Sequence, residues 1–416
     1  HGMPAQRRRF AHRRTAAEVD RCKRGERSDI KVSDWGKFGY ADREQVLSQP
    51  IQYDEQTVPI PRVKSSEVTP ESFFEQFSSR CQPVIVEGAV AQWAAMRRWD
   101  PSELEKRFRH VLFKVGEDDK GKKLRMKMKY FLDYMAHQRD DNPLYLFETG
   151  INDNVIINTL TADYEVPDLF PHDWLSLVNS DIRPPYRWFC IGPRRSGTAV
   201  HTDPLDTNAW NAVTHGSKRW VLFEPGTPKR VVKGKTVKAK AEDDEAIMYF
   251  DFLLPRLKRA HPEVRVYEGT QSAGDLIFVP GGWWHGVLNT EDCIAVTQNY
   301  CGPDNFDACW RRTRRDREKL AYLWLRNMRK FAPEIHARAV HLNQLDGFRM
   351  RHERRRGERL AGATSSSSDS TDSSSDDARD VRFIGLSDPT RGHELDGALA
   401  AAPPAASPAL AGAARR

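Results

Sequence analysis

Two histidines and an aspartate in this sequence have the residue types and the spacing of metal ligands. The stretch HTDPLDTNAWNAVTHGSKRW begins with His201 and Asp203, which lie two residues apart. Side chains two apart on a β-strand point to the same face, so both would meet a bound ion from one side. A chain with 13 histidines can produce this spacing by chance, and the alternative is that the two residues are ordinary polar residues at the end of a surface strand.

His285 is the third candidate ligand and follows an apolar strand and a Pro-Gly-Gly turn in GDLIFVPGGWWHGVLN. Two imidazoles and one carboxylate on one face of an iron ion leave three neighbouring coordination positions open, which is typical of non-haem Fe(II) oxygenases. Zinc would more usually take a tetrahedral ligand set. We therefore expect Fe(II), with His201, Asp203 and His285 as metal ligands and catalytic centre.

An Fe(II) oxygenase needs electrons to activate O2, and 2-oxoglutarate can supply them by oxidative decarboxylation. Its remote carboxylate would lie inside the barrel and need a cation, because an unpaired buried charge is costly. Lys218 in KRWVLF is the candidate cation, and Thr198 and Tyr145 would add hydroxyl hydrogen bonds. Asn211 and Thr297 would line the same cavity; the alternative for each polar side chain is satisfaction by the backbone.

Eight short β-rich runs between residues 186 and 299 must position these side chains. No amphipathic helix alternates with them, so they favour an antiparallel barrel or jelly roll over a parallel sheet. A lysine-rich insert at 229–240, followed by acidic residues 242–245, interrupts the runs and predicts a mobile surface loop. The runs are RWFCIG, TAVHT, AWNAV, KRWVLF, VRVYEG, DLIFVP, WWHGVLN and CIAVTQNY.

Composition divides the chain into five regions. In the second region we expect helices at PESFFEQF and PSELEKRF and strands at PVIVEG, VLFKVG and LRMKMK. In the fourth, DREKLAYLWLRNMRKF carries an apolar stripe that either packs against the barrel or forms the face of a homo-oligomer. The regions are a basic N-terminal arm (1–33), an α/β elaboration (34–180), the β core (181–305), a helical cap (306–348) and a disordered basic and Ser/Asp-rich tail (349–416).

Much of the net charge of +7 lies in the N-terminal arm, where the first 31 residues hold ten Lys or Arg against four Asp or Glu. Arginines 7–9, 13 and 14 with Lys23 and Arg24 predict nuclear import or nucleic-acid binding, and the alternative is a solvated basic helix. A second basic run covers Arg351–Arg359. The run TSSSSDSTDSSSDD at 364–377 cannot bury apolar surface and predicts disorder.

The spacing of the cysteines and the hydropathy of the chain indicate the cellular compartment that we expect for the protein. The six cysteines form no CxxC pair, so neither a disulfide framework nor a structural zinc module is expected, and a reducing compartment is favoured. No apolar run is long enough for a signal peptide or a membrane span. We expect a soluble intracellular protein with no membrane partner.

The segments RWFCIGPRRSGTAVHTDPLDTNAWNAVTHGSKRWVLF, GDLIFVPGGWWHGVLN and IAVTQNY resemble the JmjC family of Fe(II)/2-oxoglutarate oxygenases, and the likeness extends over roughly residues 30–330. The resemblance implies a double-stranded β-helix with an N-terminal α/β extension and C-terminal helices. It implies iron at His201, Asp203 and His285, with O2 as cosubstrate and ascorbate as reductant. It places Trp188 near the substrate pocket and 2-oxoglutarate at Tyr145, Thr198, Asn211, Lys218 and Thr297.

The same resemblance implies hydroxylation of lysyl side chains in nuclear proteins. Arg/Ser-rich splicing factors or histones are the expected substrates, in the nucleoplasm, with the nucleolus and the cytoplasm as further locations. Attack on an N-methyl carbon of arginine would give demethylation by the same chemistry. The alternatives are an asparaginyl or histidyl hydroxylase, and an RNA-binding scaffold with a vestigial metal site. An Asp at 206 where a Gly is usual, and the more basic insert at 229–245, bear on substrate preference.

Overall fold

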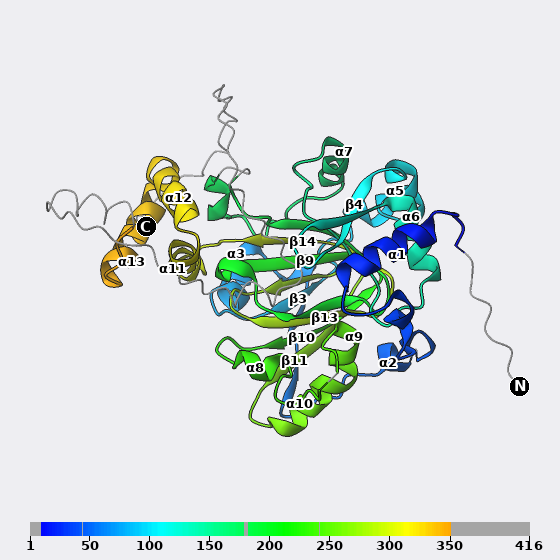
Figure 1. Cartoon of the computed structure of the whole chain (residues 1–416). Helices are drawn as coiled ribbons and strands as arrows, with labels where there is room; N and C mark the ends of the chain where they lie inside the picture. Colours follow the sequence, from blue (N-terminus) through cyan, green and yellow to red (C-terminus); the bar gives the residue numbers. More distant parts are fainter. Residues whose placement is uncertain (1–9, 44, 179–181, 241, 351–416) are drawn as a thin grey trace, which may run out of the picture. The chain divides into compact units, whose positions relative to one another are not determined.

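The structure is a computed structural model that describes residues 10–43, 45–178, 182–240 and 242–350 (Figure 1). Arginines 7–9, the basic run at 351–359 and the Ser/Asp run at 364–377 lie outside the described residues. Within the described chain, no helix combines the length and the apolar character needed to cross a membrane.

All eight predicted β-rich runs form strands, and the fold class is confirmed as a double-stranded β-helix. Successive strands are divided between two sheets: β7, β9, β12 and β14 lie in one, and β8, β10, β11 and β13 in the other. The pairings among these eight strands are antiparallel. Their bounds are β7 (Arg187–Gly192), β8 (Gly197–His201), β9 (Asn208–His215), β10 (Ser217–Phe223), β11 (Val266–Ser272), β12 (Leu276–Val279), β13 (Trp284–Asn289) and β14 (Cys293–Tyr300).

Strands from earlier in the chain complete both sheets. The five-stranded sheet has the order β1-β11-β10-β13-β8, with β1 (Thr57–Pro59) parallel to β11. The seven-stranded sheet has the order β2-β3-β12-β9-β14-β7-β6. Its added strands are β2 (Arg62–Lys64), β3 (Val84–Glu87) and β6 (Leu146–Glu148). The two sheets are therefore built from residues on both sides of position 181.

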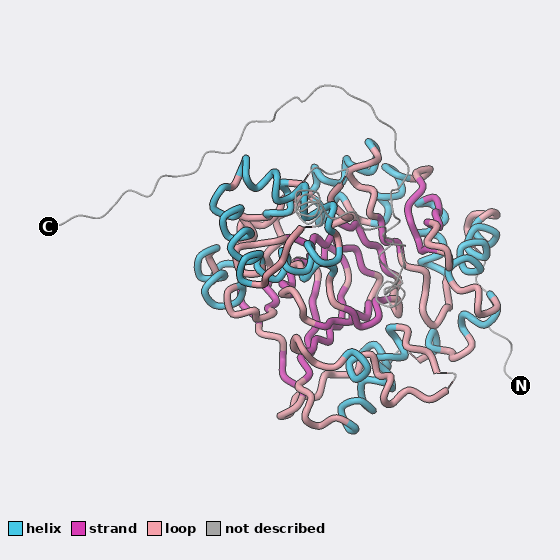
Figure 2. The backbone as a smooth tube through the Cα atoms, turned by 60° about the vertical axis from the view of Figure 1, so that its left-hand side comes forward, coloured by secondary structure: helices cyan, strands magenta, loops and turns pink. Residues whose placement is uncertain are grey.

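Helices surround the strands, as Figure 2 shows. The largest apolar cluster joins one face of the seven-stranded sheet, through residues such as Phe189 and Trp210, to helices α5 (Pro101–Phe108) and α6 (Met128–His137). Because side chains alternate along a strand, this packing leaves the neighbouring residues Trp188 and Asn211 on the opposite face of the sheet. The core thereby fixes which side chains point between the two sheets.

The N-terminal helix α1 (Thr15–Glu26) packs on the body through buried Val19 and Cys22. Lys23 is also buried, and its Nζ lies 2.6 Å from a carboxylate oxygen of Asp140. The alternative of a solvated basic helix fails for Lys23 alone, which forms a buried ion pair, whereas Arg13, Arg14 and Arg24 are exposed to solvent. Lys23 therefore does not belong to an exposed basic cluster.

The predicted surface loop at 229–240 is also wrong. Residues Val231 and Val232 of α8 (Lys229–Val232) are buried, and the Tyr249 hydroxyl donates to the carbonyl oxygen of Val232 at 2.6 Å. Tyr249 begins a π-helical turn that continues into α10 (Leu254–Ala260). The two valines anchor the insert against this helical segment, a contact that the surrounding lysines conceal in the sequence.

Three helices follow the last strand: α11 (Phe306–Asp316), α12 (Glu318–Phe331) and α13 (Pro333–Leu345). The apolar stripe of α12 is buried at Leu320, Trp324 and Met328, in a cluster that includes residues of α11 and α13. Ordinary packing therefore accounts for this stripe.

The predicted helix PESFFEQF and the predicted strands after it are present. The helix corresponds to α3 (Pro70–Phe73) and the π-helix η4 (Phe74–Ser78), and the strands include β4 (Leu112–Glu117) and β5 (Lys123–Lys127). The remaining helices are α2 (Gln45–Ser48), α4 (Ala95–Arg98), α7 (Val155–Asn158), α9 (Ala246–Met248) and the π-helix η8 (Tyr249–Leu253). The 3-10 turns are η1 (Val32–Gly36), η2 (Tyr40–Asp42), η3 (Ser65–Glu67), η5 (Thr159–Asp163), η6 (Trp174–Leu177) and η7 (Pro204–Asp206).

Candidate active site

The structure brings the three predicted metal ligands together. His201 ends β8, Asp203 follows two residues later, and His285 lies on the neighbouring strand β13, where it is the register partner of His201. One ligand atom from each residue lies within 4.8 Å of the other two. The imidazole centroids are 4.3 Å apart, and His285 Nε2 lies 4.0 Å from an oxygen of Asp203.

The backbone orients both imidazoles toward this centre. Nδ1 of His201 donates to the carbonyl oxygen of Ala199 at 2.8 Å, and Nδ1 of His285 donates to that of Trp283 at 3.1 Å. A histidine whose Nδ1 carries the proton presents the lone pair of Nε2, the form that binds a metal. Each ring is therefore held in the ligating tautomer by its own strand.

Burial sets the protonation states that a metal needs. Burial, aided by the nearby His285, lowers the pKa of His201 to about 3, so its imidazole is neutral at physiological pH. Burial raises the pKa of Asp203, against the opposing effects of His285 and Asn299. A divalent cation would offset the cost of this buried carboxylate. Two imidazole nitrogens and one carboxylate fit Fe(II) better than a closed zinc site.

Lys218 lies deeper in the same cavity, on β10 of the five-stranded sheet. Its side chain is buried, and its Nζ donates to the hydroxyl of Tyr145 at 3.4 Å. Burial alone would lower the pKa of Lys218, but Tyr145, Cys293 and Cys190 outweigh that effect and raise it. Among the described residues no carboxylate pairs with this ammonium group. The buried cation is therefore available to bind an anionic ligand.

Two polar atoms beside Lys218 also lack a protein partner. The hydroxyl of Thr198 on β8 and the side-chain carbonyl of Asn211 on β9 are buried without a hydrogen bond. Buried polar atoms are rarely left unpaired, so each needs a ligand or a solvent molecule. The Thr198 hydroxyl and the ammonium group together fit a small dicarboxylate such as 2-oxoglutarate, whereas the Asn211 carbonyl fits a hydrogen-bond donor. Thr297 differs, because its hydroxyl donates to the backbone carbonyl of Trp210 at 2.9 Å.

The seven-stranded sheet forms the opposite wall of this cavity. Trp188 on β7, Asn211 on β9 and Thr297 on β14 make one cross-strand row that faces the metal ligands. Sequence reasoning missed Asn299, which also lines the cavity and donates to the Thr207 hydroxyl at 2.9 Å. The signal was present, because Asn299 lies two residues after Thr297 on the same strand face. It missed Phe147 as well, which packs against Trp188 at 6.0 Å.

A wider cavity of about 590 Å³ opens beside His201 toward the N-terminal segment and the 229–245 insert. Arg27 joins these two segments: its guanidinium lies 2.8 Å from Asp29, 2.9 Å from Asp243 and 2.8 Å from Glu245. We call these three carboxylates the acidic rim. The charged residues of the whole lining are five basic ones, Arg27, Lys37, Lys233, Lys235 and Lys238, and eight acidic ones, Glu26, Asp29, Asp34, Asp141, Glu242, Asp243, Asp244 and Glu245.

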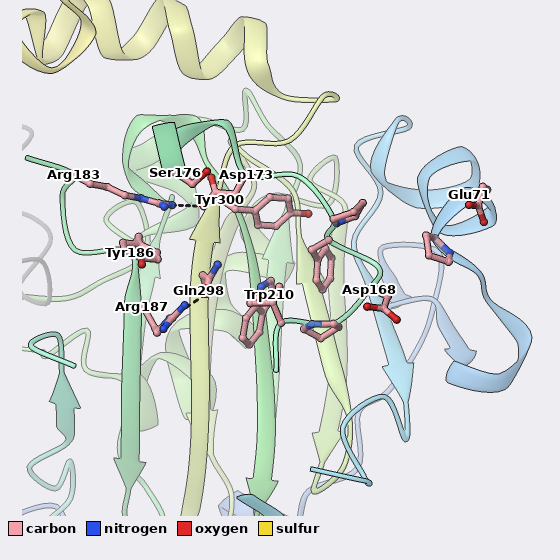
Figure 3. A pocket seen from close by; sticks show the side chains of 15 residues that line it. Glu71, Asp168, Asp173, Ser176, Arg183, Tyr186, Arg187, Trp210, Gln298 and Tyr300 are labelled. Carbon is pink, nitrogen blue, oxygen red and sulfur yellow. Dashed lines mark hydrogen bonds and ion pairs between the residues drawn. The ribbon is translucent and has the colours of Figure 1, made fainter. Parts of the chain in front are cut away.

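A separate cavity of about 790 Å³ lies on the other face of β7, β9 and β14 (Figure 3). Its floor is the adjacent cross-strand row of Arg187, Gln298 and Trp210, with Arg187 Nε donating to Gln298 at 3.2 Å. None of its lining residues belongs to the metal cavity. One row of side chains on these three strands thus lines the metal cavity, and the adjacent row lines the separate cavity on the other face of the sheet.

Comparison with known proteins agrees with this arrangement. Residues 70–306 match the family model of the cupin-like domain. The chain is 38% identical over 329 residues to the bifunctional arginine demethylase and lysyl-hydroxylase psr-1 of Caenorhabditis elegans, covering 79% of this chain and 80% of that protein. It is 35% identical to the lysine-specific demethylase JMJ21 of Arabidopsis thaliana, over 57% of this chain and 25% of that one. It is 25% identical to the 2-oxoglutarate and iron-dependent oxygenase JMJD4 of Danio rerio, over 59% and 61%.

Proposed function

Since the chain belongs to the cupin-like JmjC family of 2-oxoglutarate- and iron-dependent oxygenases, we propose that it hydroxylates lysyl side chains within arginine-rich segments of nuclear proteins. The reaction class follows from the family and from the His201, Asp203 and His285 cluster. The substrate is the proposed part, and Arg/Ser-rich splicing factors or histones are the class we favour.

The acidic rim is the observation that carries this substrate proposal. The chain as a whole is basic, with a net charge of +7, and would repel a cationic peptide. Its cavity beside His201 has the opposite balance, with eight acidic against five basic side chains. Complementary charge at an opening favours encounter with the oppositely charged partner. A lysine flanked by arginines fits this opening better than an acidic or neutral segment does.

Each group of residues has a distinct task in the proposed reaction. Iron bound with 2-oxoglutarate and O2 supplies the oxidation of a C–H bond. His201, Asp203 and His285 would hold the metal, and Lys218 would fix the remote carboxylate of 2-oxoglutarate. The hydroxyl of Thr198 would donate to the cosubstrate. The carbonyl of Asn211 can only accept a hydrogen bond, so it would serve a donor such as an ordered solvent molecule.

The aromatic wall would position the substrate. Trp188 and Phe147 lie in contact on the sheet face opposite the metal ligands, and Trp188 is buried. Their rings exclude water from one side of the cavity and offer a flat surface to an alkyl or guanidinium group. An N-methyl group of arginine held at the same point would be hydroxylated and then lost as formaldehyde. Demethylation is thus the second proposed activity of this site.

The test uses Arg/Ser-rich peptides that contain one lysine, incubated with enzyme, Fe(II), 2-oxoglutarate and ascorbate. We expect the gain of one oxygen on the lysine side chain, located by fragmentation in a mass spectrometer. Formaldehyde from methyl-arginine peptides would assign the demethylase activity instead. Oxygen on asparagine or histidine, or no product while 2-oxoglutarate is still turned over, would refute the lysyl proposal.

Substitutions in the acidic rim give a second, quantitative test of the substrate proposal. Removing two of its three charges with Asp243→Asn and Glu245→Gln should raise KM for the cationic peptide about tenfold and leave kcat nearly unchanged, because the rim binds substrate and transition state alike. The matched control is Glu55→Gln with Glu165→Gln, which removes the same charge from exposed positions elsewhere. Equal effects of the two double variants would show that only the net charge matters.

We propose a nuclear location for the same enzyme. The arginines at 13 and 14 lie in an exposed N-terminal segment, and Arg7–Arg9 and Arg351–Arg359 carry further basic residues in sequence. A full chain with the arginines at 7–9, 13 and 14 and in the 351–359 run replaced by glutamine should lose nuclear accumulation in cells. Persistent nuclear fluorescence of that variant would refute the assignment.

A further inference from the structure

Helix α12 carries an exposed basic face that the proposed activity does not use. Lys319, Tyr322, Arg326, Arg329 and Lys330 recur at intervals of three or four residues and therefore share one side of the helix. All five side chains are exposed. We call this set the basic face. Glu318, at the first position, is the one acidic residue of the helix.

The cations of the basic face have no carboxylate partner within the described chain. This sets them apart from the arginines on the neighbouring helices. Arg311 and Arg314 of α11 pair with Asp346, and Arg338 of α13 pairs with Asp307. The arginines of α11 and α13 are thus paired with carboxylates of the same two helices or of Asp346, whereas α12 presents four cations outward.

The described chain ends directly beneath α12. Met350 is fully buried, in the same apolar cluster as Trp324 and Met328 of that helix. The Ser/Asp run begins at Thr364, fourteen residues further along the chain. At roughly 3.3 Å per residue the intervening segment reaches up to about 46 Å. Because α12 is only about 21 Å long, at 1.5 Å per residue, every part of the basic face is within reach.

We propose that the Ser/Asp run, residues 364–377, docks on the basic face of α12 in the same molecule. The run contains four aspartates, at 369, 372, 376 and 377, and no basic residue. Its charge therefore matches the four cations that α12 leaves unpaired. Ser366, Ser373 and Ser374 each have an aspartate three residues later, so phosphorylation there would add charge and strengthen the contact. Docking would also close the basic face to other polyanions.

The competing partner for the run is the basic segment Arg351–Arg359, which lies nearer in sequence. The two alternatives can be separated chemically, because that segment contains arginine and histidine but no lysine. A carbodiimide joins carboxylates to amines without a spacer and does not couple them to guanidinium groups. Only docking on α12 would place the aspartates of the run against the lysine amines of Lys319 and Lys330.

The experiment treats the full chain, loaded with metal and 2-oxoglutarate, with carbodiimide and maps the joined peptides by mass spectrometry. Mixing isotopically heavy and light protein identifies links between two copies. We expect links within one copy from the run to Lys319 or Lys330. They should fall about tenfold in Arg326→Glu with Arg329→Glu, equivalent to about 1.4 kcal/mol. They should fall similarly at about 1 M salt, where screening acts within about 3 Å.

The control variant is Arg97→Glu with Arg259→Glu, which makes the same charge change at exposed arginines on other elements. It should leave the links unchanged. Arg326→Gln with Arg329→Gln gives a milder change that preserves the helix if the reversed charges disturb it. Links that mix heavy and light chains, links only to lysines outside α12, or no link to Lys319 or Lys330 would each overturn the proposal.

Discussion

Replacing Lys218 tests the assignment of the cosubstrate site most directly. Its side chain is buried, its ammonium group donates one hydrogen bond within the described chain, to the Tyr145 hydroxyl at 3.4 Å, and no described carboxylate pairs with it. If it holds the remote carboxylate of 2-oxoglutarate, Lys218→Ala leaves that charge buried and unpaired. Breaking a buried pair in this way typically costs about 3–5 kcal/mol. At about 1.4 kcal/mol per tenfold, affinity should fall by roughly two to three and a half orders of magnitude.

The same substitution should act in the opposite direction on the protein without cosubstrate. There Lys218 has no carboxylate partner among the described residues, so its removal breaks no ion pair. Lys218→Met, which keeps most of the side-chain length, should therefore melt no lower than the parent protein. The stabilisation that 2-oxoglutarate gives the parent should be absent from the variant.

Titration calorimetry of 2-oxoglutarate into Mn(II)-loaded protein measures the affinity without turnover. Binding of Mn(II) alone, in the parent and the variant, is the control for the metal site. Tyr145→Phe is the graded comparison and should cost about tenfold, the worth of one hydrogen bond to a charged group. Unchanged affinity for 2-oxoglutarate in Lys218→Ala, or an equal loss of Mn(II) affinity, would refute the reasoning.

Three further outcomes follow from the described contacts. Asp203→Ala should abolish Mn(II) binding and turnover with little change in the melting temperature, and retained turnover would contradict the ligand set. Burial raises the pKa of Glu26 to about 7 from 4.5, so the folded chain binds the extra proton and stability should fall as pH rises from about 4.5 to 7. Urea unfolding at pH 5 and pH 8 should show this decline, of up to about 3 kcal/mol, in the parent but not in Glu26→Gln. Lys23→Ala leaves the buried carboxylate of Asp140 without its cation and should destabilise the fold by about 3–5 kcal/mol, whereas Arg24→Ala, at an exposed position, should change it little.

The β core could be predicted because its signals are local. Each of the eight runs alternates or clusters β-formers between turn residues, and each forms a strand. The metal ligands could be predicted equally well, because His201 and Asp203 lie two apart at the end of one strand and His285 follows an identifiable turn. Asn299 follows Thr297 by two residues on β14, so the same alternation rule predicts that it lines the cavity.

The surroundings of the site could not be predicted, because they depend on contacts between distant segments. The insert at 229–240 has the composition of an exposed loop, yet Val231 and Val232 are buried against a helix that follows it. The N-terminal basic residues likewise look alike in sequence. Lys23 meets Asp140 from 117 positions away, and Arg27 meets Glu245 from 218 positions away. Composition gives no sign of either pairing.

These pairings explain why the net charge of the chain does not predict the local charge of the cavity beside His201, although it does predict the positive charge on the surface of α12. The basic excess of the N-terminal segment is partly neutralised by folding, since Lys23 and Arg27 are both engaged with carboxylates. One guanidinium shared among the three carboxylates of the acidic rim leaves the opening beside His201 acidic. On α12 no described carboxylate neutralises the exposed cations, and the positive charge stays at the surface. A cationic segment would thus be attracted to the metal cavity, whereas an acidic one would be attracted to α12.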